Sequence, residues 1–192
     1  MADRRTVIME AAARLIARRG VRGLRIEELA AEAEVSNGLI YYHFKDRAGV
    51  LRATLEFIND RAERYTRDHV AAEHLSDPRR VLEQTLLLEF QDTAEVRENS
   101  TAWGELRASA MFDDLLRADL AEATKVWDQE VADLIADVVP SLAPSAALAA
   151  AQRLTTLLEG LSGRWLSGGL TVDRARELIL AAITVELTHL AK

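Results

Sequence analysis

The stretch "VSNGLIYYHF", residues 35–44, places three of the chain's ten Trp, Tyr and Phe residues within four positions. Ser36 is a residue type that caps the start of a helix, so a short helix is predicted to follow it. At 3.6 residues per turn, Ile40 and Phe44 share one face of this helix and are predicted to point into a core. Tyr42 falls on the other side, and Tyr41 is intermediate. The stretch is therefore either a local aromatic core or a surface for contact with a partner.

The predicted outward face suits the groove of a nucleic acid better than it suits water. Gly38 permits close approach of a backbone, and tyrosine hydroxyls can donate to phosphate oxygens. Asn37 can reach a base edge, and Leu39 can pack against a thymine methyl group. The positive end of the helix dipole near Ser36 favours a phosphate. Composition alone leaves open the alternative that both tyrosines complete the core of a three-helix subdomain.

The flanking segments also predict helices. One is predicted over residues 4–19, ended by Gly20, and a short one over 26–33. Two short helices joined by a tight turn, the second of them capped, have the outline of a helix-turn-helix. A long helix capped by Asp46 is predicted to follow.

Most of the remaining chain predicts helix as well, because it contains few prolines and little period-two alternation. Asp77 and Pro78 predict the start of a fifth helix, and Thr171 caps a final one that runs nearly to Lys192. The breaks predicted between these points are 96–100, 111–114, 138–145 and the Ser-Gly-Gly of 167–169. The prediction is an all-α fold of about nine helices, with a three-helix helix-turn-helix head over residues 1–52 and a helical ligand-binding and dimerisation body over 53–192.

Charge is distributed unevenly along the chain. The net charge is −7, yet residues 1–52 contain ten Lys and Arg against seven Asp and Glu, which leaves −10 for the rest. A basic head on an acidic body is typical of a small phosphate-binding module attached to a part with another task.

Several classes of protein are not expected. The chain has no cysteine for a disulfide or a thiolate metal site, and no G-x-S-x-G, Walker or G-x-G-x-x-G pattern. His69 and His74 flank Glu73, but their spacing of five does not place two imidazoles on one helical face for a metal. No apolar signal core or long apolar run is present. We expect a cytoplasmic protein that is not an enzyme, needs no metal or cofactor and has no membrane partner.

The stretch "IEELAAEAEVSNGLIYYHFKDRAGVL", residues 26–51, resembles the DNA-binding segment of TetR-family transcriptional regulators. The preceding helix and its glycine-marked loop are similar to that family too, so the resemblance covers about the first 52 residues. The matched motif positions are Leu29, Ala30, Ala33, Val35, Ser36, Gly38, Ile40, Tyr41, His43, Phe44, Arg47, Val50 and Leu51.

This resemblance implies a ligand-responsive regulator, expected from family habit to be a repressor. It implies a homodimer whose two third helices enter successive major grooves of a palindromic operator, about 34–36 Å apart, and which a small-molecule effector releases. Asn37 and Leu39 are the residues we expect to read bases. Operator sequence, target genes and the number of dimers per operator are not fixed by the sequence. Carried over by position, the DNA contacts are Arg25, Ser36, Asn37, Gly38, Leu39, Tyr41, Tyr42, His43 and Arg47.

Three positions depart from the family pattern. Glu34 stands where the family usually has glycine in the turn, and a left-handed conformation there costs about 1–2 kcal/mol. Arg47 stands where lysine is commonest, and both reach phosphate. Arg25 stands where the second helix often begins with threonine. An enzyme is one rival hypothesis, and a helical partner-binding protein that has lost DNA binding, as Glu34 indicates, is a second.

The last two predicted helices carry apolar seams, and related regulators use this pair to dimerise as a four-helix bundle. The alternative is that both seams face the chain's own core. The residues predicted for the dimer interface are Leu154, Leu158, Leu161, Trp165, Leu178, Ala182 and Val185.

Large side chains in the body are candidates to line an effector pocket, although ordinary core packing is the alternative for each. Carboxylates interleaved with aromatics suit a cationic, lipophilic effector, or simply a solvated helix face, whereas Arg107 beside Trp103 suits an anionic one. The effector's charge therefore stays open. The predicted pocket residues are Phe90, Trp103, Arg107, Met111, Phe112, Trp127 and Trp165, and the carboxylates are Glu89, Asp92, Glu105, Asp113 and Asp114.

Overall fold

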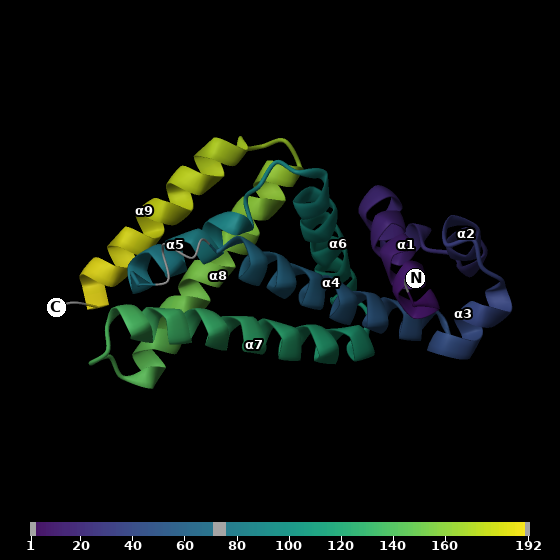
Figure 1. Ribbon diagram of the computed structural model, residues 1–192, viewed down its shortest axis with the longest axis horizontal. Helices are drawn as coiled ribbons and strands as arrows, with labels where there is room; N and C mark the ends of the chain where they lie inside the picture. The colour runs from purple at the N-terminus through teal and green to yellow at the C-terminus, as the bar shows by residue number, and fades with distance from the viewer. Residues whose placement is uncertain (1–2, 71–75, 191–192) are drawn as a thin grey trace. The chain divides into compact units, whose positions relative to one another are not determined.

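The computed structural model describes residues 3–70 and 76–190, and within these ranges it contains nine α-helices, one 3-10 helix and no strand (Figure 1). This confirms the predicted all-α class. The elements are α1 (Arg4–Arg19), η1 (Val21–Gly23), α2 (Ile26–Glu32), α3 (Asn37–Phe44), α4 (Arg47–His69), α5 (Pro78–Leu88), α6 (Ala94–Ala110), α7 (Asp114–Val138), α8 (Pro144–Leu166) and α9 (Val172–Leu190).

Local signals set most helix boundaries as predicted. Gly20 ends α1 in a conformation with φ +72°, which favours glycine. The side chains of Ser36, Asp77 and Thr171 accept hydrogen bonds from the backbone N–H three residues ahead, at 3.2 Å each. Lys192, near which the last helix was predicted to end, lies outside the described residues.

The break predicted at 96–100 is wrong, because this segment lies inside α6. The real break covers residues 89–93, and the Thr93 hydroxyl accepts from Val96 N–H at 3.3 Å. The polar residues of the segment serve helix packing instead. Arg61 of α4 donates to Glu98 Oε1 at 2.9 Å and to Asn99 Oδ1 at 2.8 Å.

The chain forms two compact units. The first comprises the residues up to Glu63 together with Arg97–Ala121, and the second comprises Arg64–Val96 with the residues from Glu122 onward. Helices α4, α6 and α7 therefore each contribute residues to both units. These packing units do not coincide with a division at residue 52, which remains a prediction about function.

Each unit has its own apolar core. In the first unit, α1, α2 and α3 gather around the beginning of α4 (Figure 1), where Ile16, Leu29 and Ile40 are among the fully buried side chains. In the second, α8 and α9 form a helical hairpin against which α5 packs, burying Phe90 and Ile183. The first core fixes how α3 is presented.

Candidate nucleic-acid interface and the residues that support it

Helix α3 has one buried and one exposed side, as predicted. Ile40 and Phe44 are 1% and 5% exposed, whereas Tyr41 and Tyr42 are 49% and 81% exposed. Aromatic side chains with this much solvent exposure contribute little to the packing of the core. The local-core alternative is therefore excluded for Tyr42, and the surface interpretation holds.

The N-terminal turn of α3 is open to solvent. Ser36, Asn37 and Gly38 are exposed, and a side chain at Gly38 would meet only the Ser36 hydroxyl, at 3.8 Å. Leu39 is less outward than predicted, because it is half-buried and packs partly against the core of its unit. The start of α3 thus presents an exposed surface without bulky side chains at Ser36, Asn37 and Gly38.

Histidine 43 lies on the flank of α3, between the two sides. Its ring makes an edge contact with Tyr42 at a centroid distance of 5.2 Å and a tilted contact with Phe44 at 5.8 Å. The half-buried His43 therefore supports the exposed Tyr42 ring from the core side.

A tight joint connects α3 to α4. Lys45 has φ +67° and ψ −52°, and Asp46 N–H donates to Phe44 O at 2.8 Å across it, which is the geometry of a strained γ-turn. A Cβ at Gly49 would lie 2.0 Å from Phe44 O, so only glycine permits this approach. The Asp46 carboxylate accepts from Gly49 N–H at 2.7 Å. Together these contacts fix the direction of α3 relative to α4.

The turn between α2 and α3 keeps the left-handed conformation on which the cost at Glu34 depends. Glu34 has φ +53°, a region that non-glycine residues adopt at a cost of about 1–2 kcal/mol. Val35 N–H still donates to Ala30 O at 2.9 Å, so the turn is closed despite the non-glycine residue. The conformational free energy lost at Glu34 must therefore be offset by other contacts in the head.

Part of the basic charge of the head is used inside it. Arg14 and Arg18 contact the Glu32 carboxylate at 3.1 Å and 2.6 Å, and Arg19 contacts Glu28 at 2.7 Å. The hydrogen bond from Arg18, and to a smaller extent the one from Arg14, lowers the pKa of the Glu32 carboxyl. These pairs join α1 to α2.

Other cations beside α3 remain available for phosphate. In the described part of the chain, Arg22, Arg25 and Lys45 are without a carboxylate partner. Arg25 begins α2 without capping it, and Lys45 follows α3. Arg47, a predicted DNA contact, donates to the carbonyls of Val21 and Leu24, so it also holds the backbone between α1 and α2.

The predicted pocket residues are divided between the two compact units. Phe90 and Trp165 meet edge-on at 6.3 Å in the core of the second unit, where Trp127 is partly buried. Trp103 and Arg107 lie in the first unit, with the guanidinium 5.5 Å from the indole. Met111 and Phe112 are 65% and 80% exposed on the turn after α6, so they lie on the surface rather than in an enclosed pocket. Nothing in the sequence distinguishes an exposed Phe112 from a buried Phe90.

The five carboxylates proposed to suit a cation have different environments. Glu105 accepts from Val21 N–H, Asp113 caps α7, Asp114 pairs with Arg117, and Asp92 is exposed. Glu89 differs from them.

Glu89 is half-buried at the end of α5, next to the fully buried Phe90, and desolvation raises its pKa to about 7. Among the described residues it has no cation or hydrogen-bond donor. A carboxylate held in apolar surroundings without a counter-charge favours a cation brought from outside.

The α8 seam predicted for a dimer interface faces the chain's own core. Leu154, Leu158, Leu161 and Trp165 are each at most 5% exposed and pack in the second unit. This is the alternative that the sequence left open. Helical spacing identifies an apolar face but not which neighbour covers it. On α9, Leu178 and Ala182 are partly buried, and only Val185 is largely exposed, at 67%.

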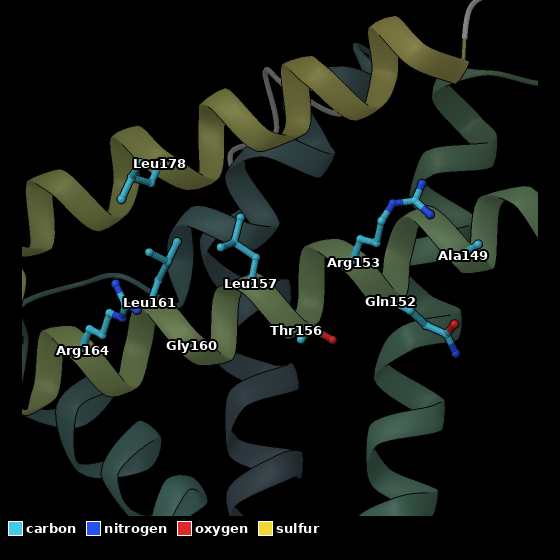
Figure 2. A pocket seen from close by; sticks show the side chains of 9 residues that line it. All are labelled: Ala149, Gln152, Arg153, Thr156, Leu157, Gly160, Leu161, Arg164 and Leu178. Carbon is cyan, nitrogen blue, oxygen red and sulfur yellow. The ribbon is translucent and has the colours of Figure 1, made fainter.

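An adjoining face of α8, with the buried Leu161 at its edge, lines an open groove with α9 (Figure 2). The groove measures about 910 Å³, and in Figure 2 the side chains of Leu157 and Leu161 rise from α8 toward the side of α9 that carries Leu178. A Cβ added at Gly160 would meet no atom within 4 Å. No prediction from the sequence singled out this face, and Gly160, a glycine inside a helix, is the feature of the sequence that could have indicated it. The lining residues are Ala149, Gln152, Arg153, Thr156, Leu157, Gly160, Leu161, Arg164 and Leu178.

Over residues 3–70 and 76–190, no group of three or more His, Cys, Asp and Glu side chains is placed to hold a metal ion. Glu73 and His74 lie outside the described residues. None of the described helices combines the length and the apolar character needed to cross a membrane.

Two family models match this chain, one near its N-terminus and one over most of the rest. The family model for bacterial regulatory proteins of the tetR family matches residues 8–54, and the model for the C-terminal domain of BetI-type transcriptional repressors matches residues 78–188. The HTH-type transcriptional regulator BetI of Burkholderia cenocepacia is 29% identical over 188 residues, which are 96% of this chain and 93% of that protein. BetI of Yersinia pestis is 27% identical over 169 residues, 88% of this chain and 82% of that protein.

Two solved structures are similar over nearly the whole length. A structure from Rhodococcus sp., assigned to the TetR family of transcriptional regulators, is 46% identical with a TM-score of 0.87, covering 97% of this chain and 100% of that one. A structure described as a transcriptional regulator from Saccharomonospora viridis in complex with choline is 28% identical with a TM-score of 0.78, covering 94% and 95%.

Proposed function

The chain belongs to the TetR family of bacterial transcriptional regulators, and we propose that it is a repressor that binds a palindromic operator as a homodimer and is released by a small organic cation. The observation that carries this proposal is the division of α3 into a buried side, with Phe44, and an exposed side, with Tyr42. Members of the family regulate transcription, and the exposed side of α3 is the surface proposed to read the operator.

In this proposal, the exposed N-terminal turn of α3 enters the major groove. Asn37 reaches a base edge, Gly38 lets the helix approach closely, and Tyr41 and Tyr42 donate to phosphates. Leu39, being half-buried, offers only part of its side chain to a thymine methyl group. Arg25 and Lys45 lie at the ends of α2 and α3 and neutralise neighbouring phosphates.

The homodimer is proposed to form over the groove of α8 and α9 rather than over the buried seam. Leu157 of α8 and Val185 of α9 are 37% and 67% exposed, so each helix of the pair presents an apolar side chain to solvent. Gly160 lines the same open groove as Leu157, and glycine costs about 1 kcal/mol relative to alanine inside a helix. Because glycine has no side chain, Gly160 would let α8 of a second copy approach this helix closely. The bidentate pair of Arg153 with Glu186 borders this surface.

A small quaternary ammonium ion is the proposed effector class. The BetI-type C-terminal match and the choline complex of the relative from S. viridis support it. Glu89 supplies a carboxylate without a counter-charge in apolar surroundings. Phe90 follows Glu89 in the chain, and the centroid of its ring lies 6.3 Å from that of Trp165. Aromatic faces attract quaternary ammonium groups.

Release is proposed to follow from a shift between two conformations of the dimer. An effector that prefers the conformation with the reading helices out of register lowers operator affinity. Coupling of about 1–3 kcal/mol corresponds to a change of about 5–150-fold in affinity.

The proposal is tested by footprinting the purified protein on the DNA that flanks its own coding region and then adding choline. We expect a protected palindrome that choline uncovers. The matched control is 3,3-dimethyl-1-butanol, which has the shape of choline without its charge and should leave the footprint intact. Equal affinity for choline with and without operator would contradict release by a cation, and absence of any protected site would contradict operator binding.

A further inference from the structure

The junction between α1 and α2 is held by a side chain from far along the chain. Val21 begins η1, is 4% exposed, and donates its N–H to Glu105 Oε2 of α6 at 3.2 Å. The two residues are 84 positions apart. A Cβ at Gly20 would lie 2.6 Å from the same carboxylate oxygen. The contact therefore depends on glycine at position 20 and on the carboxylate of Glu105.

A second side chain holds the other side of this junction. Arg47 of α4 donates from Nε to Leu24 O at 2.9 Å and from Nη2 to Val21 O. The three-residue η1 is thus fixed by an acceptor from α6 and a donor from α4. These two side chains therefore hold the segment that leads into α2 and, through α2, to α3.

We propose that Glu105 is a positioning residue for DNA binding, which fixes α2 and α3 to α6 through the Val21 N–H. This inference rests on the proposed function, because it assumes that α3 reads the operator. It removes Glu105 from the candidates for the effector's counter-charge and gives it a task in the head. Because α6 contributes residues to both compact units, a displacement of α6 moves the acceptor on which the junction depends.

The test compares three variants of the full-length protein. Glu105→Ala removes the acceptor, Glu105→Gln keeps an acceptor oxygen without the charge, and Glu95→Gln changes an exposed glutamate of the same helix. Two readouts are taken: hydrogen exchange of the Val21 amide, and affinity for the footprinted duplex at a temperature where every variant is folded.

For Glu105→Ala we expect faster exchange at Val21 and an operator affinity lower by about fivefold to tenfold, the loss typical of one hydrogen bond. Glu105→Gln and Glu95→Gln should keep both values within about twofold of the wild type. Unchanged exchange in Glu105→Ala would overturn the inference, and so would faster exchange with unchanged affinity or a Glu105→Gln variant as impaired as Glu105→Ala. A wild-type protein without affinity for DNA would instead defeat the proposed function, and exchange at Val21 would still show whether Glu105 holds the junction.

Discussion

Tyr42 and Phe44, two positions apart in α3, face opposite sides of the helix. Tyr42 is 81% exposed and Phe44 is 5% exposed. Two positions correspond to about 200° around a helix, so the same short segment anchors itself in a core with one ring and offers the other to a partner. The proposed binding of the head to DNA depends on this arrangement.

The first prediction separates the two rings. Tyr42→Ala should leave the free energy of unfolding nearly unchanged and weaken operator binding, because the ring is 81% exposed and is proposed to contact DNA. Phe44→Ala should lower the free energy of unfolding by about 3–5 kcal/mol, the typical cost of truncating a buried phenylalanine. Urea denaturation and duplex titration measure the two effects. Equal losses of stability in both variants would show that the facing of α3 is misassigned.

The second prediction concerns the left-handed turn at Glu34. Glu34→Gly should raise the free energy of unfolding by about 1 kcal/mol, because glycine adopts φ +53° without the Cβ conflict. The control is Glu27→Gly in the exposed face of α2, which should lower it by about 1 kcal/mol. A Glu34→Gly protein less stable than the wild type in urea would mean that the Glu34 side chain makes a stabilising contact.

The third prediction tests the face of α8 proposed for dimerisation. Gly160→Leu should yield a folded monomer, because the added side chain has free space in its own subunit and occupies the space proposed for the second copy. Gly104→Leu in α6 is the matched control, since a Cβ there also meets no atom within 4 Å. Sedimentation velocity should give a monomer for the first and a dimer for the second. A dimer in both would move the interface elsewhere.

The fourth prediction follows from the raised pKa of Glu89. A carboxyl that binds its proton more tightly in the folded protein than in the unfolded chain favours folding at low pH. With a folded-state pKa of about 7, this contribution is lost as pH rises from about 4.5 to about 7. Glu89→Gln should therefore gain up to about 3 kcal/mol in free energy of unfolding over the wild type at pH 8, and little at pH 4. A pH-independent difference would show that Glu89 ionises freely.

The same carboxyl gives the effector affinity a pH dependence. A cation favours ionised Glu89, whose ionised fraction rises about tenfold between pH 6 and pH 8 if its pKa is about 7. Calorimetric affinity for choline should rise by a similar factor, and Glu89→Gln should lose the rise. A wild-type affinity that is flat over this range would place the cation elsewhere.

The head was more predictable from sequence than the body, for physical reasons. Helix caps such as Ser36 and Asp77 accept a hydrogen bond from the backbone three residues ahead, so a short stretch of sequence is enough to predict them. The helical spacing of Leu154 and Leu158 identifies an apolar face, but a core and a dimer interface demand the same spacing. The polar run at 96–100 looked like a loop because its partner Arg61 lies far away in sequence. Glu105 could not be assigned to the head, because its contact with Val21 spans 84 positions.

The central claim, that exposed α3 binds a duplex beside the basic residues of the head, is tested most directly by the salt dependence of binding to the footprinted operator. A dimer that contacts about 6–10 phosphates should lose about 10³–10⁵ in affinity between 50 and 200 mM salt. Tyr42→Ala should bind more weakly throughout that range. An affinity that does not change with salt, or that is the same for the operator and for a scrambled duplex, would contradict the account.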